Sequence, residues 1–129
     1  MMSEKIQFEK EIPIRTSVGI LYDMLTTPSG LSDWFCEDVN IDGDVFSFFW
    51  DGVEEKAELL RASKNEFVRY KWLEDEEDDT YFEFRIKIDG ITKDVALIVT
   101  DFADDQDEVE ENQLIWESQF NDLKRVIGA

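Results

Sequence analysis

The sequence predicts an α+β fold in which a curved, seven-stranded antiparallel sheet wraps around a long C-terminal helix, with two short helices after the first strand. Three observations lead to this prediction. Apolar and polar residues alternate over about Glu37–Phe102, and Asp-Gly pairs interrupt the alternation. Before this region a short helical pattern ends at Pro28, and after it an apolar stripe runs through Val109–Ile127. With 129 residues and a hydrophobic fraction of 43%, residues 1–129 are expected to form a single domain with a real core.

The N-terminal segment predicts one strand followed by two short helices. In Lys5–Ile14 the apolar side chains recur mainly at every second residue, and Pro13, which has no N–H, indicates a strand end or a sheet edge. Thr16 and Ser17 offer an N-cap for an amphipathic helix, which Pro28 stops because the residue before a proline avoids the helical region. A second helical turn starts at this proline or at the next residue.

Six strands are expected in the alternating region, and turn signals separate them. Lys64-Asn65 predicts one turn, and the acidic run Glu74–Asp79 predicts a solvated loop. The segment Asp94–Phe102 is apolar in both phases, which predicts a strand covered on both faces. Three Asp-Gly pairs predict tight hairpins: Asp42-Gly43, Asp51-Gly52 and Asp89-Gly90.

The chain ends in a predicted helix. Acidic residues crowd its start, and Lys124 and Arg125 lie near its end, as the helix dipole favours, before Gly128 closes it. A seven-stranded sheet must twist and bury one face, and this helix is the element able to cover it. Its apolar stripe, with Gln113 in the gap, consists of Val109, Trp116, Phe120, Leu123 and Ile127.

Charge and composition restrict the function. The net charge of −19 repels phosphate backbones and anionic lipid headgroups, so neither nucleic-acid binding nor a membrane-surface role is expected. A partner with a basic surface stays open, although such acidity also serves solubility. No apolar run is long enough to span a membrane, the N-terminus has no signal-peptide pattern, and Cys36 is the single cysteine. These features predict a cytoplasmic protein.

The segment 25–35, LTTPSGLSDWF, carries a resemblance to a known family. It has Thr26, Pro28, Leu31, Trp34 and Phe35 where the START-like superfamily typically shows a T-x-P-x-x-L-x-x-W-F-like pattern. The order of predicted elements also resembles the helix-grip fold of that superfamily, which includes the birch-pollen-allergen type proteins and polyketide cyclases. Within it, the chain looks most like small bacterial proteins similar to the C-terminal domain of the heat-shock ATPase activator. This resemblance implies the fold rather than one function, because the superfamily hosts carriers, enzymes and co-chaperones.

A ligand cavity between the sheet and the last helix is one function that the resemblance implies. The aromatic rings expected to face the space between the sheet and the last helix could line such a cavity, or they could fill the space themselves. Gln113 could anchor a ligand or lie at a partly exposed margin, and Trp34 with Phe35 could form the cavity mouth or plug the core. The candidate ligand-binding residues are Trp34, Phe48, Trp50, Tyr70, Trp72, Phe84, Gln113, Trp116 and Phe120.

No catalytic residue, metal site or cofactor is predicted. The chain has no histidine, which removes the Ser-His and Cys-His nucleophile systems. The acidic runs Glu74–Asp79 and Asp101–Glu111 lack the ligand spacing of an EF-hand and are expected to be solvated. Cys36 has no basic neighbour in sequence and is interpreted as a small strand residue rather than a nucleophile.

Two hypotheses follow for the function. The first is a non-enzymatic binding module that holds a small apolar or amphipathic ligand between the sheet and the C-terminal helix. The second is a protein-interaction module resembling the heat-shock ATPase activator domain, with an acidic surface that meets a basic patch. Cyclase-like or hydrolase-like catalysis is disfavoured because histidine is absent.

Overall fold

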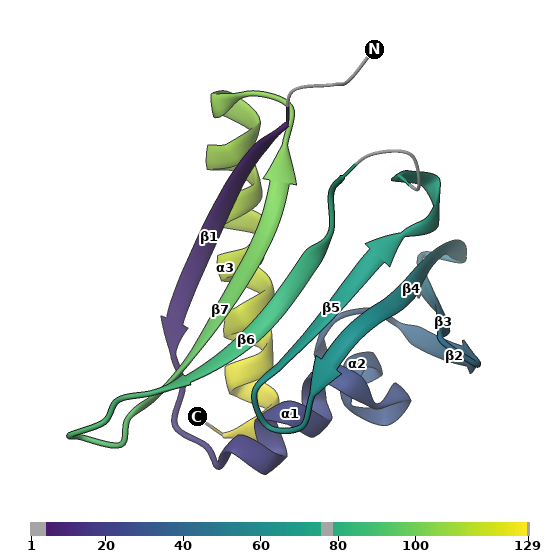
Figure 1. Cartoon of the computed structure of the whole chain (residues 1–129). Helices are drawn as coiled ribbons and strands as arrows, with labels where there is room; N and C mark the ends of the chain where they lie inside the picture. The colour runs from purple at the N-terminus through teal and green to yellow at the C-terminus, as the bar shows by residue number, and fades with distance from the viewer. Residues whose placement is uncertain (1–4, 76–78, 129) are drawn as a thin grey trace.

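The computed structural model describes residues 5–75 and 79–128 and confirms the predicted order of elements (Figure 1). The middle of the acidic run Glu74–Asp79 therefore lies outside the described residues. The elements are β1 (Ile6–Pro13), α1 (Val18–Thr26), α2 (Pro28–Trp34), β2 (Asp38–Asp42), β3 (Val45–Trp50), β4 (Val53–Ser63), β5 (Phe67–Trp72), the 3-10 turn η1 (Leu73–Asp75), β6 (Phe82–Ile88), β7 (Val95–Ala103) and α3 (Gln106–Ile127).

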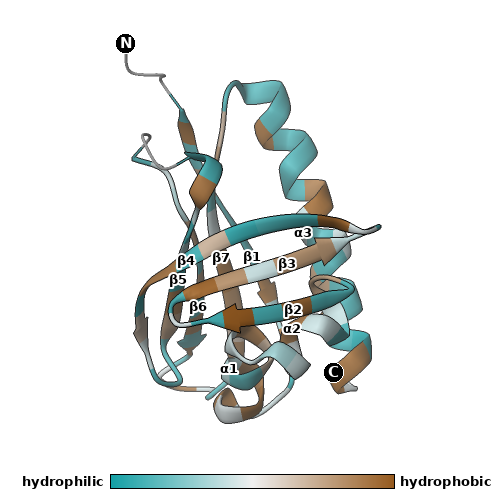
Figure 2. Ribbon diagram, turned by 90° about the vertical axis from the view of Figure 1, so that its right-hand side faces the viewer, coloured by the Kyte–Doolittle hydropathy of each residue, from teal (hydrophilic) through white to brown (hydrophobic). Residues whose placement is uncertain are grey.

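The seven strands form one antiparallel sheet in the order β1-β7-β6-β5-β4-β3-β2. Pro13 ends β1, which is also an edge strand, so no ladder hydrogen bond is lost at this proline. In β4, the longest strand, the register shifts between Leu59 and Arg61, and such a bulge bends a strand. Figure 2 shows the result: β2, β3 and β4 run steeply across the direction of β1, β6 and β7. The sheet therefore curls toward α3, as the helix-grip fold requires.

Turn chemistry is as predicted at two of the three Asp-Gly pairs. Gly43 follows β2 directly, and Asp51 and Gly52 form the whole turn between β3 and β4 with φ values of 49° and 79°. The turn at Asp89 differs, because six residues separate the paired Ile88 and Val95. The Asp89 carboxylate accepts hydrogen bonds from two backbone N–H groups of this longer loop, which lowers its pKa. A local carboxylate turn has replaced the tight hairpin there.

The corner between α1 and α2 uses ring side chains to satisfy backbone groups. The last carbonyls of a helix have no partner within it, and α1 ends abruptly before Pro28. The Trp34 indole N–H donates to the Met24 carbonyl at 2.7 Å, and the Tyr70 hydroxyl donates to the Leu25 carbonyl at 2.9 Å. Both rings are buried, so these two bonds tie α1 to α2 and to β5 where water cannot substitute.

Gly30 allows the two helices to meet closely. A Cβ atom at this position would lie 2.5 Å from the Asp23 carbonyl oxygen and 2.7 Å from the Met24 Cα atom. Both are main-chain atoms of α1 and cannot rotate away. The glycine in the LTTPSGLSDWF segment is therefore required by the close approach of α2 to α1.

Aromatic rings occupy the centre of the space between the sheet and α3. Edge-on and stacked contacts link them, with centroids 5.1 Å apart for Tyr70 and Phe82 and 5.8 Å apart for Phe82 and Phe84. The core is thus built mainly from the protein's own rings and leucines. The largest fully buried side chains are Tyr70, Phe48, Phe82, Phe84, Phe120, Leu21, Leu25, Leu31, Leu97, Leu123, Val68 and Val99.

Strand β7 differs from the prediction that both of its faces are covered. Leu97 and Val99 are fully buried, but Ile98, on the other face, is only half-buried. In the register Ile98 lies between Glu11 of β1 and Arg85 of β6, so the stems of charged side chains are its nearest cover. Continuous apolarity in this strand therefore reflects one buried face and one face shielded by neighbours on the same sheet.

Candidate functional site

A cleft of about 380 Å³ opens at the margin between the sheet and the middle of α3. The strands contribute side chains from β3, β4, β5 and β7, and the turn after α2 contributes Phe35. The helix contributes residues at spacings of three and four, which place them on one face. The cleft is lined by Phe35, Trp50, Glu55, Trp72, Asp101, Asn112, Ile115, Trp116 and Gln119.

Phe35 organises the aromatic side of the cleft. Its ring stacks on Trp116, with centroids 6.0 Å and planes 12° apart, and meets Trp50 edge-on at 5.3 Å. The Trp50 indole N–H donates to the Phe35 carbonyl at 2.8 Å, and the Trp50 and Trp72 centroids are 6.2 Å apart. Phe35 and Trp116 are buried, whereas Trp50 and Trp72 are only partly buried. The cleft therefore has a firmly packed aromatic floor and two accessible rings on its rim.

Asp101 places a carboxylate beside these rings. Its two oxygens accept hydrogen bonds from the Trp116 indole N–H at 3.0 Å and from the Phe102 backbone N–H at 2.8 Å. Burial raises the pKa of Asp101 against the effect of these bonds, and the charges of Asp75 and Glu108 raise it further. The sequence interpretation of the whole run Asp101–Glu111 as solvated is therefore wrong at its first residue, which is part of β7.

Glu55 supplies a second carboxylate from β4. Burial raises the pKa of Glu55, and the neighbouring charge of Glu74 adds to the effect. A smaller hollow of about 240 Å³ adjoins the cleft and shares Glu55 and Trp72 with it. Its other lining residues are Glu54, Lys56, Leu73 and Glu74. The acidic side of the cleft thus continues toward η1.

The structure separates the nine predicted ligand-binding residues into three groups. Trp50, Trp72 and Trp116 line the cleft. Gln113 instead donates to the Glu9 carbonyl of β1 at 3.2 Å, which holds α3 against the edge strand. The remaining five are buried in the core and do not line the cleft: Trp34, Phe48, Tyr70, Phe84 and Phe120.

The Trp34-Phe35 pair divides between two environments. Trp34 turns into the core, where its ring lies 5.8 Å from Phe84 and 6.1 Å from Phe120. Phe35 is equally buried but forms part of the cleft floor. Of the two alternatives for this pair, Trp34 is placed as a core residue and Phe35 at the cleft.

Comparison with known proteins identifies the family. The profile of the START-like superfamily domain matches residues 2–129, nearly the whole chain. This chain belongs to the START-like superfamily. Membership supports a ligand-binding or interaction role in general, without specifying the ligand or partner. No match to this START-like chain was found among curated proteins.

Solved structures agree with this assignment. The START-like chain is 32% identical to BfR322 from Bacteroides fragilis, with 98% of this chain and 93% of that chain covered and a TM-score of 0.67. Aha1 from Colwellia psychrerythraea, described as a dimer, is 18% identical, with 92% and 93% covered and a TM-score of 0.75. Protein MLL2253 from Mesorhizobium loti is 16% identical, with 95% and 97% covered and a TM-score of 0.76. The last two likenesses show the shared fold alone.

Sequence reasoning missed several cleft residues of this START-like protein. Asn112 and Gln119 lie on the helix face next to the apolar stripe, at spacings of four and three from Trp116. That spacing is a signal that could have found them. Glu55 and Asp101 could not have been found in this way, because each is one of many acidic residues and only the fold brings these two to the rings.

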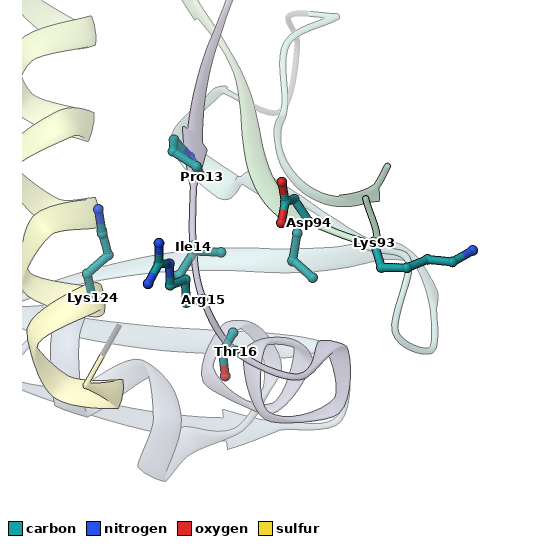
Figure 3. Close-up of a pocket in the computed structure, with 8 residues that line it drawn as sticks. Pro13, Ile14, Arg15, Thr16, Lys93, Asp94 and Lys124 are labelled. Carbon is teal, nitrogen blue, oxygen red and sulfur yellow. The ribbon is translucent and has the colours of Figure 1, made fainter. Parts of the chain in front are cut away.

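A larger hollow of about 550 Å³ lies near the C-terminal end of α3, where Lys124 borders it, and Figure 3 shows its lining. Arg15 and Lys124 lie on one side of it, while Lys93 extends away from them. Its walls come from the end of β1, the loop that follows it, the start of β7 and Lys124 of α3, and among the described residues no aromatic ring lines it. The cleft therefore offers the better defined binding surface of the two.

Reactive groups in the described residues do not assemble into a catalytic or metal site. Cys36 lies in the turn before β2, not in a strand as predicted, and burial raises its pKa to about 11. Its thiol is therefore protonated at neutral pH and unreactive. Within residues 5–75 and 79–128 no three carboxylate or thiol side chains are grouped to hold a metal ion. No helix in the same ranges is both long and apolar enough to cross a membrane.

Proposed function

We propose that this START-like protein is a non-enzymatic module that binds a small amphipathic ligand at the aromatic cleft. The observation that carries this proposal is the pair of partly buried rings, Trp50 and Trp72, above a packed floor of Phe35 and Trp116. Ligand pockets are mostly apolar, with a few polar groups that fix orientation, and they occupy roughly 300–1,000 Å³. A cleft of about 380 Å³ bordered by Asn112, Gln119 and two carboxylates fits that description.

The filled interior supports a ligand at the margin rather than one enclosed by the sheet. Phe48, Tyr70 and Phe84 are fully buried. Phe48 contacts Tyr70, and Phe82 links Tyr70 to Phe84, so the rings form a continuous network. A ligand at the centre would have to displace these packed rings, which is costly in a close-packed core. A ligand on Trp50 and Trp72 would displace only water.

Trp72 gives the cleft a polar group that the fold does not use. The indole N–H groups of Trp34, Trp50 and Trp116 each donate to a protein oxygen. Within the described part of the chain, the Trp72 indole has no such acceptor, and it is partly exposed. Its N–H is therefore available to a bound molecule, as is common for tryptophans at binding surfaces.

Among the described residues, neither the Cys36 thiol nor the Tyr70 hydroxyl is activated as a nucleophile, which favours binding without catalysis. Burial raises the pKa of Cys36 to about 11 and raises the pKa of Tyr70 as well, so both stay protonated at neutral pH. The chain has no histidine to act as a base for either group.

Two measurements test this proposal. The first is mass spectrometry of small molecules that copurify with the folded protein. The second is titration with Nile red, a neutral apolar probe, for which we expect saturable binding near one probe per chain. Trp72→Ala should weaken this binding, whereas Lys87→Ala, an exposed position on β6 outside the cleft, should leave it unchanged. A wild type that carries no compound and binds no probe saturably would exclude the cleft as a ligand site.

A protein-interaction role is the second candidate, and the exposed face of α3 favours it. Leu114 and Ile115 are 66% and 55% exposed, which is unusual for adjacent large apolar residues. Glu110 and Glu117 lie one turn before and after Leu114 on this helix. Such a surface suits a partner with apolar residues inside a basic rim. Leu114→Ser should abolish capture of that partner without altering Nile red binding, and retained capture would exclude this surface.

A further inference from the structure

The charged residues that line the cleft, among those the structure describes, all have the same sign. Glu55 and Asp101 line it, and no lysine or arginine does so among the described residues. Charges from three further carboxylates reach these two groups: Glu74 acts on Glu55, while Asp75 and Glu108 act on Asp101. Neither Glu55 nor Asp101 forms a salt bridge within the described residues, although other carboxylates of the protein do. The lining of the cleft is therefore negative, because Lys56 lines only the adjoining hollow and forms no salt bridge with Glu55 or Asp101 within the described residues.

On the opposite, outer face of the sheet, aromatic rings are accompanied by arginine side chains. There the guanidinium of Arg69 lies 4.1 Å from the centroid of Tyr81, and that of Arg85 lies 4.4 Å from the centroid of Phe67. Both arginines also form salt bridges with Glu83, which is buried. Outside the cleft, then, the protein supplies its own cation to rings and a carboxylate that lie together.

The cleft combines the same groups without the cation. Trp50 and Trp72 are only partly buried, and Glu55 lies in the same lining. No cation–ring contact is found at Trp50, Trp72 or Trp116 in residues 5–75 and 79–128. Aromatic faces attract cations through their quadrupole, most strongly for tryptophan and where water is partly excluded. A nearby carboxylate adds direct attraction.

We propose that the cleft binds an organic cation, an ammonium whose apolar substituents lie on Trp50 and Trp72 and whose charge faces Glu55 and Asp101. This inference rests on the proposed function and specifies its ligand. In the cleft, the ammonium would have the role toward the rings that the guanidinium groups of Arg69 and Arg85 have toward Tyr81 and Phe67 on the outer face. A fatty acid or a phosphate ester would instead bring a negative charge into an already negative cleft, so these ligands are disfavoured.

The ionisation of the two carboxylates is consistent with an unfilled cation position. Burial raises the pKa of both groups, and no cation in the described residues offsets this. A bound cation stabilises the ionised form and would lower both values. Binding should therefore release a fraction of a proton near the pH at which these groups titrate, and a neutral ligand should not.

The test uses three compounds with one hydrocarbon chain: octyltrimethylammonium, 1-octanol and octanoate, each below its aggregation limit. Binding is followed by tryptophan fluorescence, because three of the four tryptophans line the cleft. We expect the ammonium to bind roughly tenfold more tightly than the alcohol, with octanoate weakest. Equal affinity for ammonium and alcohol would overturn the cation preference while the proposed function stands. No saturable binding of any of the three would overturn both, and tightest binding of octanoate would overturn the cation preference.

A matched pair of variants separates the cleft from the general field of an acidic chain. Glu55 and Glu58 are both on β4, but Glu55 lines the cleft and Glu58, next to the inward Ala57, is exposed on the other face. Glu55→Gln should weaken octyltrimethylammonium binding roughly fivefold and leave 1-octanol binding unchanged. Glu58→Gln makes the same change in net charge and should alter neither. Equal weakening by both variants would show a diffuse attraction and overturn the assignment of the charge to the cleft.

Discussion

The α1–α2 corner and the cleft beside α3 are both built around tryptophan, but they use it in opposite ways. At the corner, Trp34 is 7% exposed and its N–H completes the end of a helix. At the cleft, Trp72 is partly exposed and its N–H has no acceptor within the described residues. The corner contains satisfied groups that hold the fold together, whereas the cleft has two partly exposed rings and the Glu55 carboxylate, which forms no salt bridge within the described residues. The comparison teaches that a tryptophan can complete the backbone of a buried corner or present a partly exposed ring at a cleft, depending on where the fold places it.

The largest expected effect comes from making the same truncation in both regions. Trp34→Ala removes a packed ring and leaves the Met24 carbonyl without its donor, so we expect a loss of about 3–5 kcal/mol in the free energy of unfolding. Trp72→Ala removes a partly exposed ring and should lose roughly 1–2 kcal/mol, together with probe binding. Urea denaturation followed by circular dichroism measures both. Similar losses at the two positions would remove the distinction between corner and cleft.

A second test addresses the close approach within the corner. Gly30→Ala would force a Cβ atom against main-chain atoms of Asp23 and Met24, and overpacking of this kind costs roughly 1–3 kcal/mol or more. Gly19→Ala is the matched control, because nothing lies within 4 Å of its Cβ position in α1. That variant should gain roughly 0.5–1 kcal/mol from helix propensity. The midpoint of urea denaturation should fall for Gly30→Ala and rise for Gly19→Ala. If both midpoints move in the same direction, the α1–α2 corner is less tightly constrained than its geometry indicates.

A third, smaller effect isolates one hydrogen bond. Tyr70→Phe keeps the buried ring and removes only the hydroxyl that donates to the Leu25 carbonyl. Leaving this buried carbonyl unsatisfied should cost about 1–2 kcal/mol of unfolding free energy. Tyr81→Phe, at a partly exposed ring on the outer face, should be close to neutral in the same denaturation series. An unchanged stability of Tyr70→Phe would mean that another donor reaches the Leu25 carbonyl.

The smallest effect is a pH dependence that arises on the cleft side. The pKa values of Glu55 and Asp101 are raised in the folded protein, so as the pH falls the folded chain binds protons before the unfolded chain does. Stability should therefore rise from neutral pH toward the ordinary carboxylate range near pH 4, where the unfolded chain is protonated too and the gain stops. Thermal midpoints between about pH 7 and pH 5 measure this rise.

A variant identifies the source of that pH dependence. Glu55→Gln removes one titrating group of the cleft and should reduce the rise, whereas Glu58→Gln, on the exposed face of the same strand, should leave it as in the wild type. An identical slope in wild type and Glu55→Gln would assign the dependence to the many other carboxylates of the chain.

Most of the fold could be predicted from the sequence because its signals are local. The alternation within each strand between Glu37 and Phe102, the stop at Pro28 and the stripe of the last helix are local patterns, and their order along the chain resembles the helix-grip fold. The Asp51-Gly52 turn is likewise determined by two residues that accept positive φ. At Asp89 the prediction was wrong, because a side-chain turn competed with the tight hairpin.

Only the tertiary structure decided what each ring and carboxylate does. Trp34 and Trp72 were both predicted to bind a ligand, but Trp34 at the end of α2 packs into the core, whereas Trp72 at the end of β5 lines the cleft. Asp101 and Glu55 are 46 residues apart in the sequence and line one cleft because the curled sheet brings β4 and β7 to the same helix. Patterning along a chain records which side of an element is buried. Which groups share a cleft depends on contacts between distant elements, and these are determined by packing of the whole sheet around α3.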